Sequence, residues 1–190
     1  MIYGDGVRLR AIEREDVPTF VRWFNDPQVR DFLLMYRPMS LADEERWFES
    51  LADRKDDLLF AVEALVEGQW VHIGNTGLHD VDWKNSHATF GIALGEKQYW
   101  GLGYGTETTR TVLRYAFNEL GLHRVELEVF AFNPRAIRCY EKAGFCREGT
   151  RRQSHFHNGQ YHDAHRMSIL REEFEEQSPQ PSADLDPAGG

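Results

Sequence analysis

The segment Trp100-Gly101-Leu102-Gly103-Tyr104-Gly105-Thr106 carries glycine at alternate positions and lies between a strand-like run and a helical pattern. Glycine lets an anion approach the backbone closely and reaches φ values that other residues avoid. Because a helix begins here, its free N–H groups and the positive end of its dipole point to one spot. The loop therefore predicts a phosphate-binding turn. A glycine-rich turn without a ligand is the alternative, because short glycine patterns are common.

Two familiar nucleotide-binding motifs do not fit this loop. No Lys-Ser or Lys-Thr pair follows Gly105, as a Walker loop requires. The Rossmann pattern needs a glycine three residues after its second one, and Thr106 occupies that position after Gly103. The surrounding sequence must therefore identify the ligand.

The elements next to the loop alternate between strands and a helix. Strands are predicted before it at residues 58–66, 70–78 and 88–94, and the first two form a hairpin. After it, residues 106–120 place apolar side chains on one helical stripe that stops at Gly121.

The remaining elements complete a mixed α/β domain. Towards the N-terminus we predict a strand at residues 7–11, a helix over residues 13–25 and a second helix that begins at Ser40. Towards the C-terminus we predict a strand at residues 123–130, a helix at 134–143, the start of another strand at 145–151, a tight turn at Asn158-Gly159 and a strand at 161–170.

A second segment makes the pattern specific: Asn133-Pro134-Arg135-Ala136-Ile137-Arg138-Cys139-Tyr140-Glu141-Lys142-Ala143-Gly144-Phe145. Together with the glycine loop it resembles the two signature regions of the GNAT superfamily of N-acetyltransferases. The branch that contains ribosomal-protein N-terminal acetyltransferases and spermidine acetyltransferases is similar in four more places. These are Val7-Arg8-Leu9-Arg10, Asn25-Asp26-Pro27-Gln28-Val29, Gly74-Asn75-Thr76-Gly77 and Asn158-Gly159-Gln160-Tyr161, so the resemblance covers nearly all of residues 7–174.

The resemblance implies both a fold and an activity. The fold is α/β (α+β), with a central mixed, largely antiparallel sheet of about six to seven strands, flanked by helices and splayed at the cofactor site. The activity is transfer of an acetyl group from acetyl-CoA to a primary amine. The amine is a protein or peptide N-terminus, or a small amine such as a polyamine or aminoglycoside. Chemistry of this type requires no metal.

The resemblance also assigns residues to the cofactor. The backbone of the strand that enters the loop pairs with pantetheine, the loop amides bind the pyrophosphate, and two side chains of the second segment complete the site. These residues are Ile92, Ala93 and Leu94; Trp100, Gly101, Leu102, Gly103, Tyr104, Gly105 and Thr106; and Asn133 and Tyr140.

Two of these side chains are candidates for catalysis. Tyr140 matches the family tyrosine whose hydroxyl lies near the sulfur of coenzyme A, where it protonates the departing thiolate. The alternative is a core tyrosine. Asn133 can hold the pantetheine arm, cap the helix before Pro134, or do both.

The sequence departs from the family pattern at two positions. Trp100 stands where relatives often have Arg or Gln, and binding should survive because the contacts are mainly to backbone amides. Thr89 stands where many relatives carry a glutamate as general base. Replacement proton acceptors are His79, Asp80 or Asp82, which we expect in the turn after the second hairpin strand. A surface histidine and turn-forming aspartates are the alternative.

A histidine cluster surrounds the closing hairpin, at His155, His157, His162 and His165. Alternation sends hairpin residues to opposite faces, so we expect a solvated hairpin near the acceptor opening and no metal. Five aromatic residues are candidates for lining an acceptor pocket or for packing in the core: Phe24, Phe32, Tyr36, Trp47 and Trp83.

The missing glutamate leaves a second function open. A non-catalytic module that binds coenzyme A and regulates a partner would keep the loop and lose the base, as Thr89 suggests. Turnover of acetyl-CoA with any amine would separate the two hypotheses.

Composition limits partners and location. The chain has 190 residues and a formal net charge of -9, which argues against nucleic-acid binding and favours a cationic partner. No apolar run reaches the roughly 18 to 20 residues of a membrane span, and a signal-peptide pattern is absent. We therefore expect a cytoplasmic protein with two buried thiols, Cys139 and Cys146, and a homodimer as in many proteins of this type.

The last part of the chain differs in composition from the rest. We predict one domain over residues 1–174 and an acidic, Pro/Ser/Gly-containing disordered tail over residues 175–190.

Overall fold

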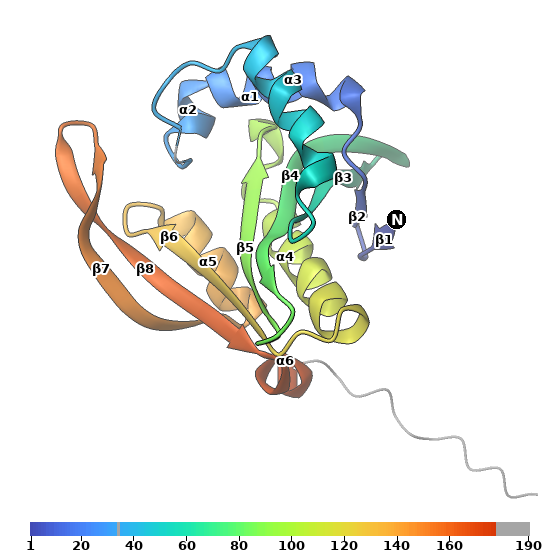
Figure 1. The fold of residues 1–190 in the computed structure, drawn as a ribbon, viewed down its shortest axis with the longest axis vertical. Helices are drawn as coiled ribbons and strands as arrows, with labels where there is room; N and C mark the ends of the chain where they lie inside the picture. The colour runs from blue at the N-terminus through green and yellow to red at the C-terminus, as the bar shows by residue number, and fades with distance from the viewer. Residues whose placement is uncertain (34, 178–190) are drawn as a thin grey trace, which may run out of the picture.

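Eight strands form one sheet in the computed structural model, which describes residues 1–33 and 35–177 (Figure 1). The strand order is β1-β2-β3-β4-β5-β6-β8-β7, and β5 with β6 is the parallel pair among these otherwise antiparallel neighbours. The strands are β1 Ile2–Tyr3, β2 Val7–Arg10, β3 Leu58–Val66, β4 Gln69–Asp82, β5 His87–Leu94, β6 Arg124–Phe130, β7 Cys146–His157 and β8 Gln160–Leu170. The mixed, largely antiparallel α/β fold that the sequence predicts is confirmed.

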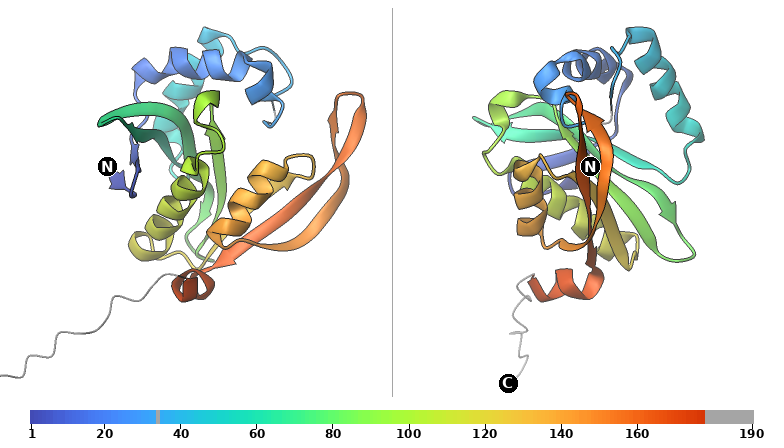
Figure 2. Two further views of the ribbon diagram at one scale, coloured as in Figure 1. Left: turned by 180° about the vertical axis from the view of Figure 1, so that it is seen from behind. Right: turned by 90° about the vertical axis from the view of Figure 1, so that its left-hand side faces the viewer.

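The helices occupy two places around the sheet. Helices α4 and α5 lie against one face, whereas α1, α2 and α3 lie across the end at which β5 finishes (Figures 1 and 2). The helices are α1 Val17–Asn25, α2 Pro27–Arg30, α3 Leu41–Ser50, α4 Tyr104–Arg114 with a π-helical turn at Tyr115–Glu119, α5 Pro134–Ala143 and α6 Arg171–Gln177.

Local sequence signals set the ends of α5. The Asn133 side chain accepts a hydrogen bond from the Ala136 N–H at 3.1 Å, and Pro134 occupies the first turn, where no N–H is needed. Gly144 ends the helix at φ +104°, a left-handed conformation that favours glycine. The cap fixes where α5 begins beside β6, and so fixes the position of the side chains along it.

Two apolar clusters hold these layers together. The larger one joins the sheet to α4 and α5 and includes Leu78, Phe90, Phe117 and Met167. The smaller one lies under α1 to α3 and consists of the side chains Phe20, Trp23, Phe24 and Val29 with their partly buried neighbours. The N-terminal helices are therefore packed as a separate apolar unit on the end of the sheet.

The structure extends or corrects several predicted boundaries. A two-residue edge strand, β1, raises the strand number to eight. The second hairpin strand continues to Asp82 through a register shift, so the predicted turn at residues 79–82 is wrong. Helix α6 reaches Gln177, which makes the first three residues of the predicted tail helical, and residues 178–190 lie outside the described part. Cys146 is exposed, contrary to the expected buried thiol.

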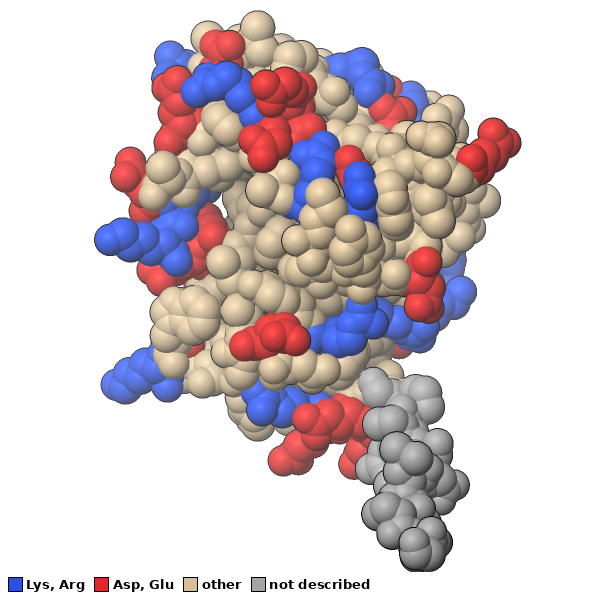
Figure 3. Space-filling view, turned by 90° about the vertical axis from the view of Figure 1, so that its right-hand side faces the viewer, with Lys and Arg blue, Asp and Glu red and all other residues tan. Residues whose placement is uncertain are grey.

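Charges of both signs are interspersed on the face that lies on the right of Figure 1, as the space-filling view shows (Figure 3). Lys and Arg do not gather into one patch there. Among the described residues, no helix is both long enough and apolar enough to cross a membrane.

Candidate functional site

Strands β5 and β6 separate soon after they begin. They pair only at His87 with Arg124, Ala88 with Val125 and Thr89 with Glu126. Beyond these pairs β5 stays with β4 and β6 stays with β8, so the two strands fan apart towards α1 (Figure 1). Residues 91–94 therefore present an edge of β5 that β6 does not pair. The predicted splayed strands are present.

A cavity of about 760 Å³ occupies this opening and continues to the N-terminal helices. Its walls come from the glycine loop, the splayed strands, α5 and parts of residues 12–33 and 35–47. Of the predicted catalytic and cofactor-binding residues, those that line it are His79, Ile92, Ala93, Leu94, Trp100, Gly101, Gly103, Gly105, Thr106, Asn133 and Tyr140. Leu102 is exposed and Tyr104 packs on Tyr99, and neither contributes to the wall.

The glycine loop has the backbone that the sequence predicts. Gly101 and Gly103 have φ of +78° and +98°, and a side chain at either position would be strained. The backbone N–H groups of residues 101–106 donate to no acceptor within the described residues. Gly103 stands immediately before α4, so these free N–H groups meet at a helix N-terminus, where an anion is stabilised.

Three basic side chains of α5 line the cavity beside the loop: Arg135, Arg138 and Lys142. The guanidinium of Arg135 lies over the Trp100 ring, 3.8 Å from its centroid. We did not select these residues from the sequence, although spacings of three and four place them on one helix face. That face puts cations next to the free amides, as a polyanionic ligand requires.

Tyr140 lies inside the cavity wall with 9% of its surface exposed. Its ring packs edge-on against Phe90 and Phe145, with centroids 6.1 and 5.9 Å away. Burial raises the pKa of the phenol, so the hydroxyl keeps its proton. The hydroxyl makes no hydrogen bond with the described residues, and it is not a buried unsatisfied atom. It is therefore available to a ligand.

Asn133 is buried and its side-chain oxygen caps α5, which is one of the two roles considered for it. The cap fixes the orientation of the amide, and the residue lines the cavity. Its NH2 group has no hydrogen-bond partner among the described residues.

His79 lies in β4 directly opposite Thr89, the position that lacks the family glutamate. A Cβ atom at Gly91 would be 3.2 Å from the His79 Nε2, so glycine at position 91 leaves space for the imidazole. On the other side of the ring, Nδ1 is 3.8 Å from the Asp57 Oδ1. The imidazole thus lies between a carboxylate and the floor of the cavity.

The other two candidate bases lie elsewhere. Asp80 sits at the irregular part of β4 with φ +50°, and Asp82 accepts hydrogen bonds from Asn85. Neither lines the cavity. Of the three proton acceptors that the sequence suggests, His79 is the one with access to the site.

The hairpin histidines contact protein groups near the cavity. His155 Nε2 is 2.9 Å from the Glu128 Oε1, and the rings of His157 and His162 pack against Phe132. His165 contacts Thr150 on the opposite face of the hairpin. In the described part of the chain no three His, Cys, Asp or Glu side chains form a group that could hold a metal ion.

The aromatic candidates divide between wall and surface. Phe24, Phe32 and Trp47 line the cavity. Tyr36 and Trp83 are 89% and 52% exposed and lie outside it. One wall of the cavity is therefore built from α1, α3 and the segment that follows α2, and we propose that this wall is the acceptor end.

Residues 7–146 match the family described as the Acetyltransferase (GNAT) domain. The chain belongs to the GNAT acetyltransferase family. It is therefore an acyltransferase that moves an acetyl group to an amine, as the resemblance of its two signature segments predicts.

Individual relatives cover nearly the whole domain. "SPbeta prophage-derived uncharacterized N-acetyltransferase YokL" of Bacillus subtilis is 35% identical over 90% of this chain and 94% of its own length. "Putative ribosomal N-acetyltransferase YdaF" of the same species is 34% identical over 90% of this chain and 95% of its own.

A solved structure of a GNAT enzyme has the same fold. Spermidine N-acetyltransferase from Vibrio cholerae, in complex with CoA and spermine, superposes with a TM-score of 0.81 at 27% identity. The match covers 90% of this chain and 98% of that one. Both branches that the sequence resembles thus occur among its relatives.

Proposed function

We propose that the protein transfers the acetyl group of acetyl-CoA to a primary amine. The observation that carries the proposal is the glycine loop at the mouth of the β5–β6 opening, whose N–H groups at residues 101–106 have no acceptor among the described residues. The structure of the Vibrio cholerae relative with CoA supports the same donor.

The donor half of the cavity fits the chemistry of coenzyme A. Free loop amides and the cationic face of α5 suit its phosphates, whereas the unpaired edge of β5 at Ile92, Ala93 and Leu94 suits the two amides of pantetheine. Asn133 and Trp100 flank this path, and the Trp100 indole N–H is held by the Leu94 carbonyl at 2.8 Å.

The reaction needs a group on each side of the thioester. The amine nitrogen attacks the thioester carbonyl carbon, the carbon–sulfur bond breaks, and one proton leaves the nitrogen. In our proposal His79 accepts that proton and Tyr140 donates its hydroxyl proton to the departing thiolate. The Asp57 Oδ1 lies behind the ring, 3.8 Å from Nδ1 and beyond hydrogen-bond distance, so this carboxylate favours the protonated imidazole through its charge. Thr89 lies opposite His79 on the adjacent strand and cannot act as a base.

The experiment measures thiol release from acetyl-CoA with a panel of amines and peptides, alongside calorimetric titration with CoA. Release of thiol with formation of the acetylated amine is the expected result. Tight binding of CoA with no turnover for any acceptor would favour the regulatory module, and absence of both would overturn the proposal.

Location and assembly follow as separate proposals. Cys139 and Cys146 are free thiols, which fits the reducing cytoplasm, and we propose that location. We also propose self-association, as a homodimer or a larger assembly. Support comes from the dodecameric structure of the Vibrio cholerae enzyme, with a TM-score of 0.77, and from the exposed ring pair Phe156–Tyr161 on the hairpin. Light scattering tests it, and a monomer at all protein concentrations would contradict it.

A further inference from the structure

The acceptor end of the cavity has an unusual chemical composition. Every described residue that the N-terminal segment contributes to the wall is apolar: Ile12, Phe24, Val29, Phe32, Leu33, Met35 and Trp47. These side chains extend the smaller apolar cluster into the cavity. The surface that meets the acceptor is therefore one that an alkyl or aromatic group would fill.

Negative charge is scarce in the same wall. Glu128 is the one carboxylate among the described residues that line the cavity. It already receives the Arg151 guanidinium at 2.7 Å and lies 2.9 Å from the His155 Nε2. Burial acts to raise the pKa of Glu128, but the hydrogen bonds from His155 and Arg151 lower it overall, so it is an ionised partner of these two groups.

The net charge of -9 thus does not arise in the cavity, whose lining holds Arg135, Arg138 and Lys142 beside the single carboxylate Glu128. A polyamine carries several ammonium groups, and each one that enters an apolar wall without a carboxylate is penalised by lost hydration. An amine with a single ionisable nitrogen avoids this penalty. That nitrogen must be neutral in order to react, so no further charge enters the cavity.

We propose that the preferred acceptor is a primary amine with a single ionisable nitrogen and a bulky apolar group a few bonds away. This proposal rests on the proposed acetyl transfer and narrows it. Two classes of amine combine a single reactive nitrogen with a bulky apolar group: arylalkyl amines, and peptides whose first residue is large and apolar. The apolar group fills the space beside Phe32, Met35 and Trp47 and directs the nitrogen to His79.

The test compares kcat/KM of the full chain for spermidine, 2-phenylethylamine, a peptide beginning with Leu and the same peptide beginning with Ser. We expect at least about a tenfold preference for one of the two apolar acceptors over both spermidine and the Ser peptide. The comparison of 2-phenylethylamine with the Leu peptide shows which of the two classes of amine the enzyme prefers. Equal or better use of spermidine or of the Ser peptide would overturn the proposal and leave acetyl transfer intact, whereas no turnover with any acceptor would overturn both.

A pair of adjacent variants tests the wall itself. Met35→Glu adds a carboxylate to the cavity, and Tyr36→Glu adds the same charge at a side chain that is 89% exposed and outside it. We expect the ratio of kcat/KM for spermidine to that for 2-phenylethylamine to rise about tenfold in the first variant and to stay constant in the second. The ratio comes from one enzyme preparation, so partial misfolding does not change it. Equal ratios in both variants would refute the proposal.

Discussion

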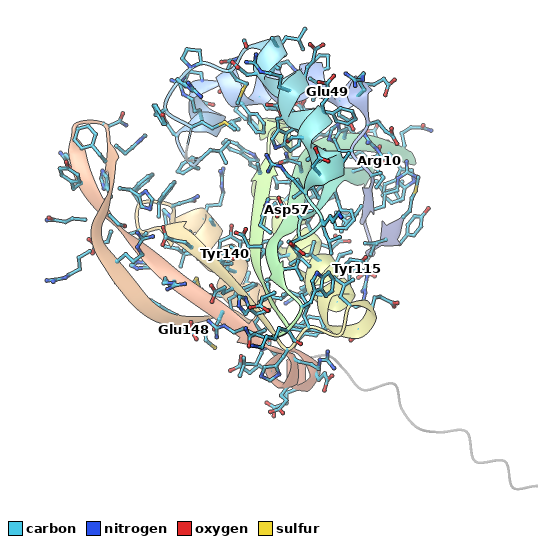
Figure 4. The ribbon with its side chains drawn as sticks, viewed as in Figure 1. Arg10, Glu49, Asp57, Tyr115, Tyr140 and Glu148 are labelled. Carbon is cyan, nitrogen blue, oxygen red and sulfur yellow. The ribbon has the colours of Figure 1, made fainter. Side chains whose placement is uncertain are left out.

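Tyr140 and His79 approach β5 from opposite faces of the sheet. Tyr140 packs on Phe90, whereas His79 lies over Gly91, the next residue along the strand. Neighbouring strand residues point to opposite faces, so the two side chains cannot contact each other directly. In the stick view, Tyr140 and Asp57, the partner of His79, are both labelled near the centre of the molecule (Figure 4). In the proposed mechanism, this arrangement separates the group that protonates the leaving thiolate from the group that accepts the proton of the amine.

Removing the Tyr140 hydroxyl should slow the chemical step. Tyr140→Phe keeps the ring packing against Phe90 and Phe145 and removes only the proton donor. We expect kcat to fall about 10²- to 10⁴-fold, with the Kd for CoA within about twofold of wild type. Rapid-mixing kinetics and calorimetry measure the two quantities. Unchanged turnover would remove Tyr140 from the mechanism.

His79→Gln should slow acetyl transfer. Glutamine keeps a polar side chain over Gly91 but cannot act as a general base. We expect kcat/KM to fall about 10²-fold or more, with the Kd for CoA within about twofold of wild type. Asp57→Asn should show a smaller loss, since it removes only the charge behind the ring. A rate equal to that of wild type would exclude His79 as the base.

At the scale of elements, the start of α4 is the proposed anion site. Gly103 allows the turn because its φ of +98° is accessible to glycine, and the helix dipole of α4 begins one residue later. The loop is therefore locally less stable, but its amide groups remain free to bind an anion.

Gly103→Ala should weaken cofactor binding. The substitution costs about 1–2 kcal/mol in a left-handed backbone, or it distorts the loop. Gly68→Ala is the matched control, because Gly68 has φ +80° and empty space around its Cβ position but lies in the β3–β4 turn away from the cavity. Both variants should lose stability in denaturant unfolding, and only Gly103→Ala should raise the Kd for CoA, about tenfold or more. Equal affinities would contradict the assigned cradle.

Helix α3 carries a buried carboxyl group that predicts a pH-dependent stability. Glu44 is 2% exposed, and burial raises its pKa from 4.5 to about 7. Between these values the folded state binds more protons than the unfolded state, so the free energy of unfolding falls as pH rises and then levels above pH 7.

Glu44→Gln should remove this dependence. At about 1.4 kcal/mol per pKa unit, wild type should lose up to about 3 kcal/mol relative to the variant between pH 4.5 and pH 7. Glu45→Gln, on the exposed side of α3, is the control and should follow wild type. Urea unfolding at several pH values measures the difference, and parallel curves for all three proteins would disprove the effect.

At the scale of the whole molecule, the sheet consists of two parts that share little pairing. Three residue pairs join β5 to β6, while the parts β1–β5 and β6–β8 are each continuous. A ligand in the opening contacts both parts and should stabilise their relative position.

Coenzyme A should therefore protect the opening as well as stabilise the fold. At about 100 times its Kd it should add about 2.7 kcal/mol to the free energy of unfolding. Hydrogen exchange should slow at the amides of residues 91–94 and 101–106, whereas the paired residues 87–89 change less. Unaltered exchange at the loop would contradict the assigned binding mode.

Much of the fold could be predicted from local sequence. The helix caps, the hairpin turns and the apolar stripe of α4 are encoded by neighbouring residues, and their positions agree with the structure within a few residues. Asp82 shows where prediction from local sequence fails. Its polar neighbours indicate a turn, but pairing with His87 on β5 keeps this part of the chain in a strand.

The sequence by itself determined the glycine loop, the α5 segment and hence the family, because these depend on backbone conformations and caps that a few adjacent residues set. Only the tertiary structure decided which side chains share the cavity. It brought Asp57, His79 and Gly91 together and filled the acceptor wall with apolar side chains. The physical reason is that these contacts join residues far apart in the chain, and their distances follow from strand register and helix packing rather than from local spacing.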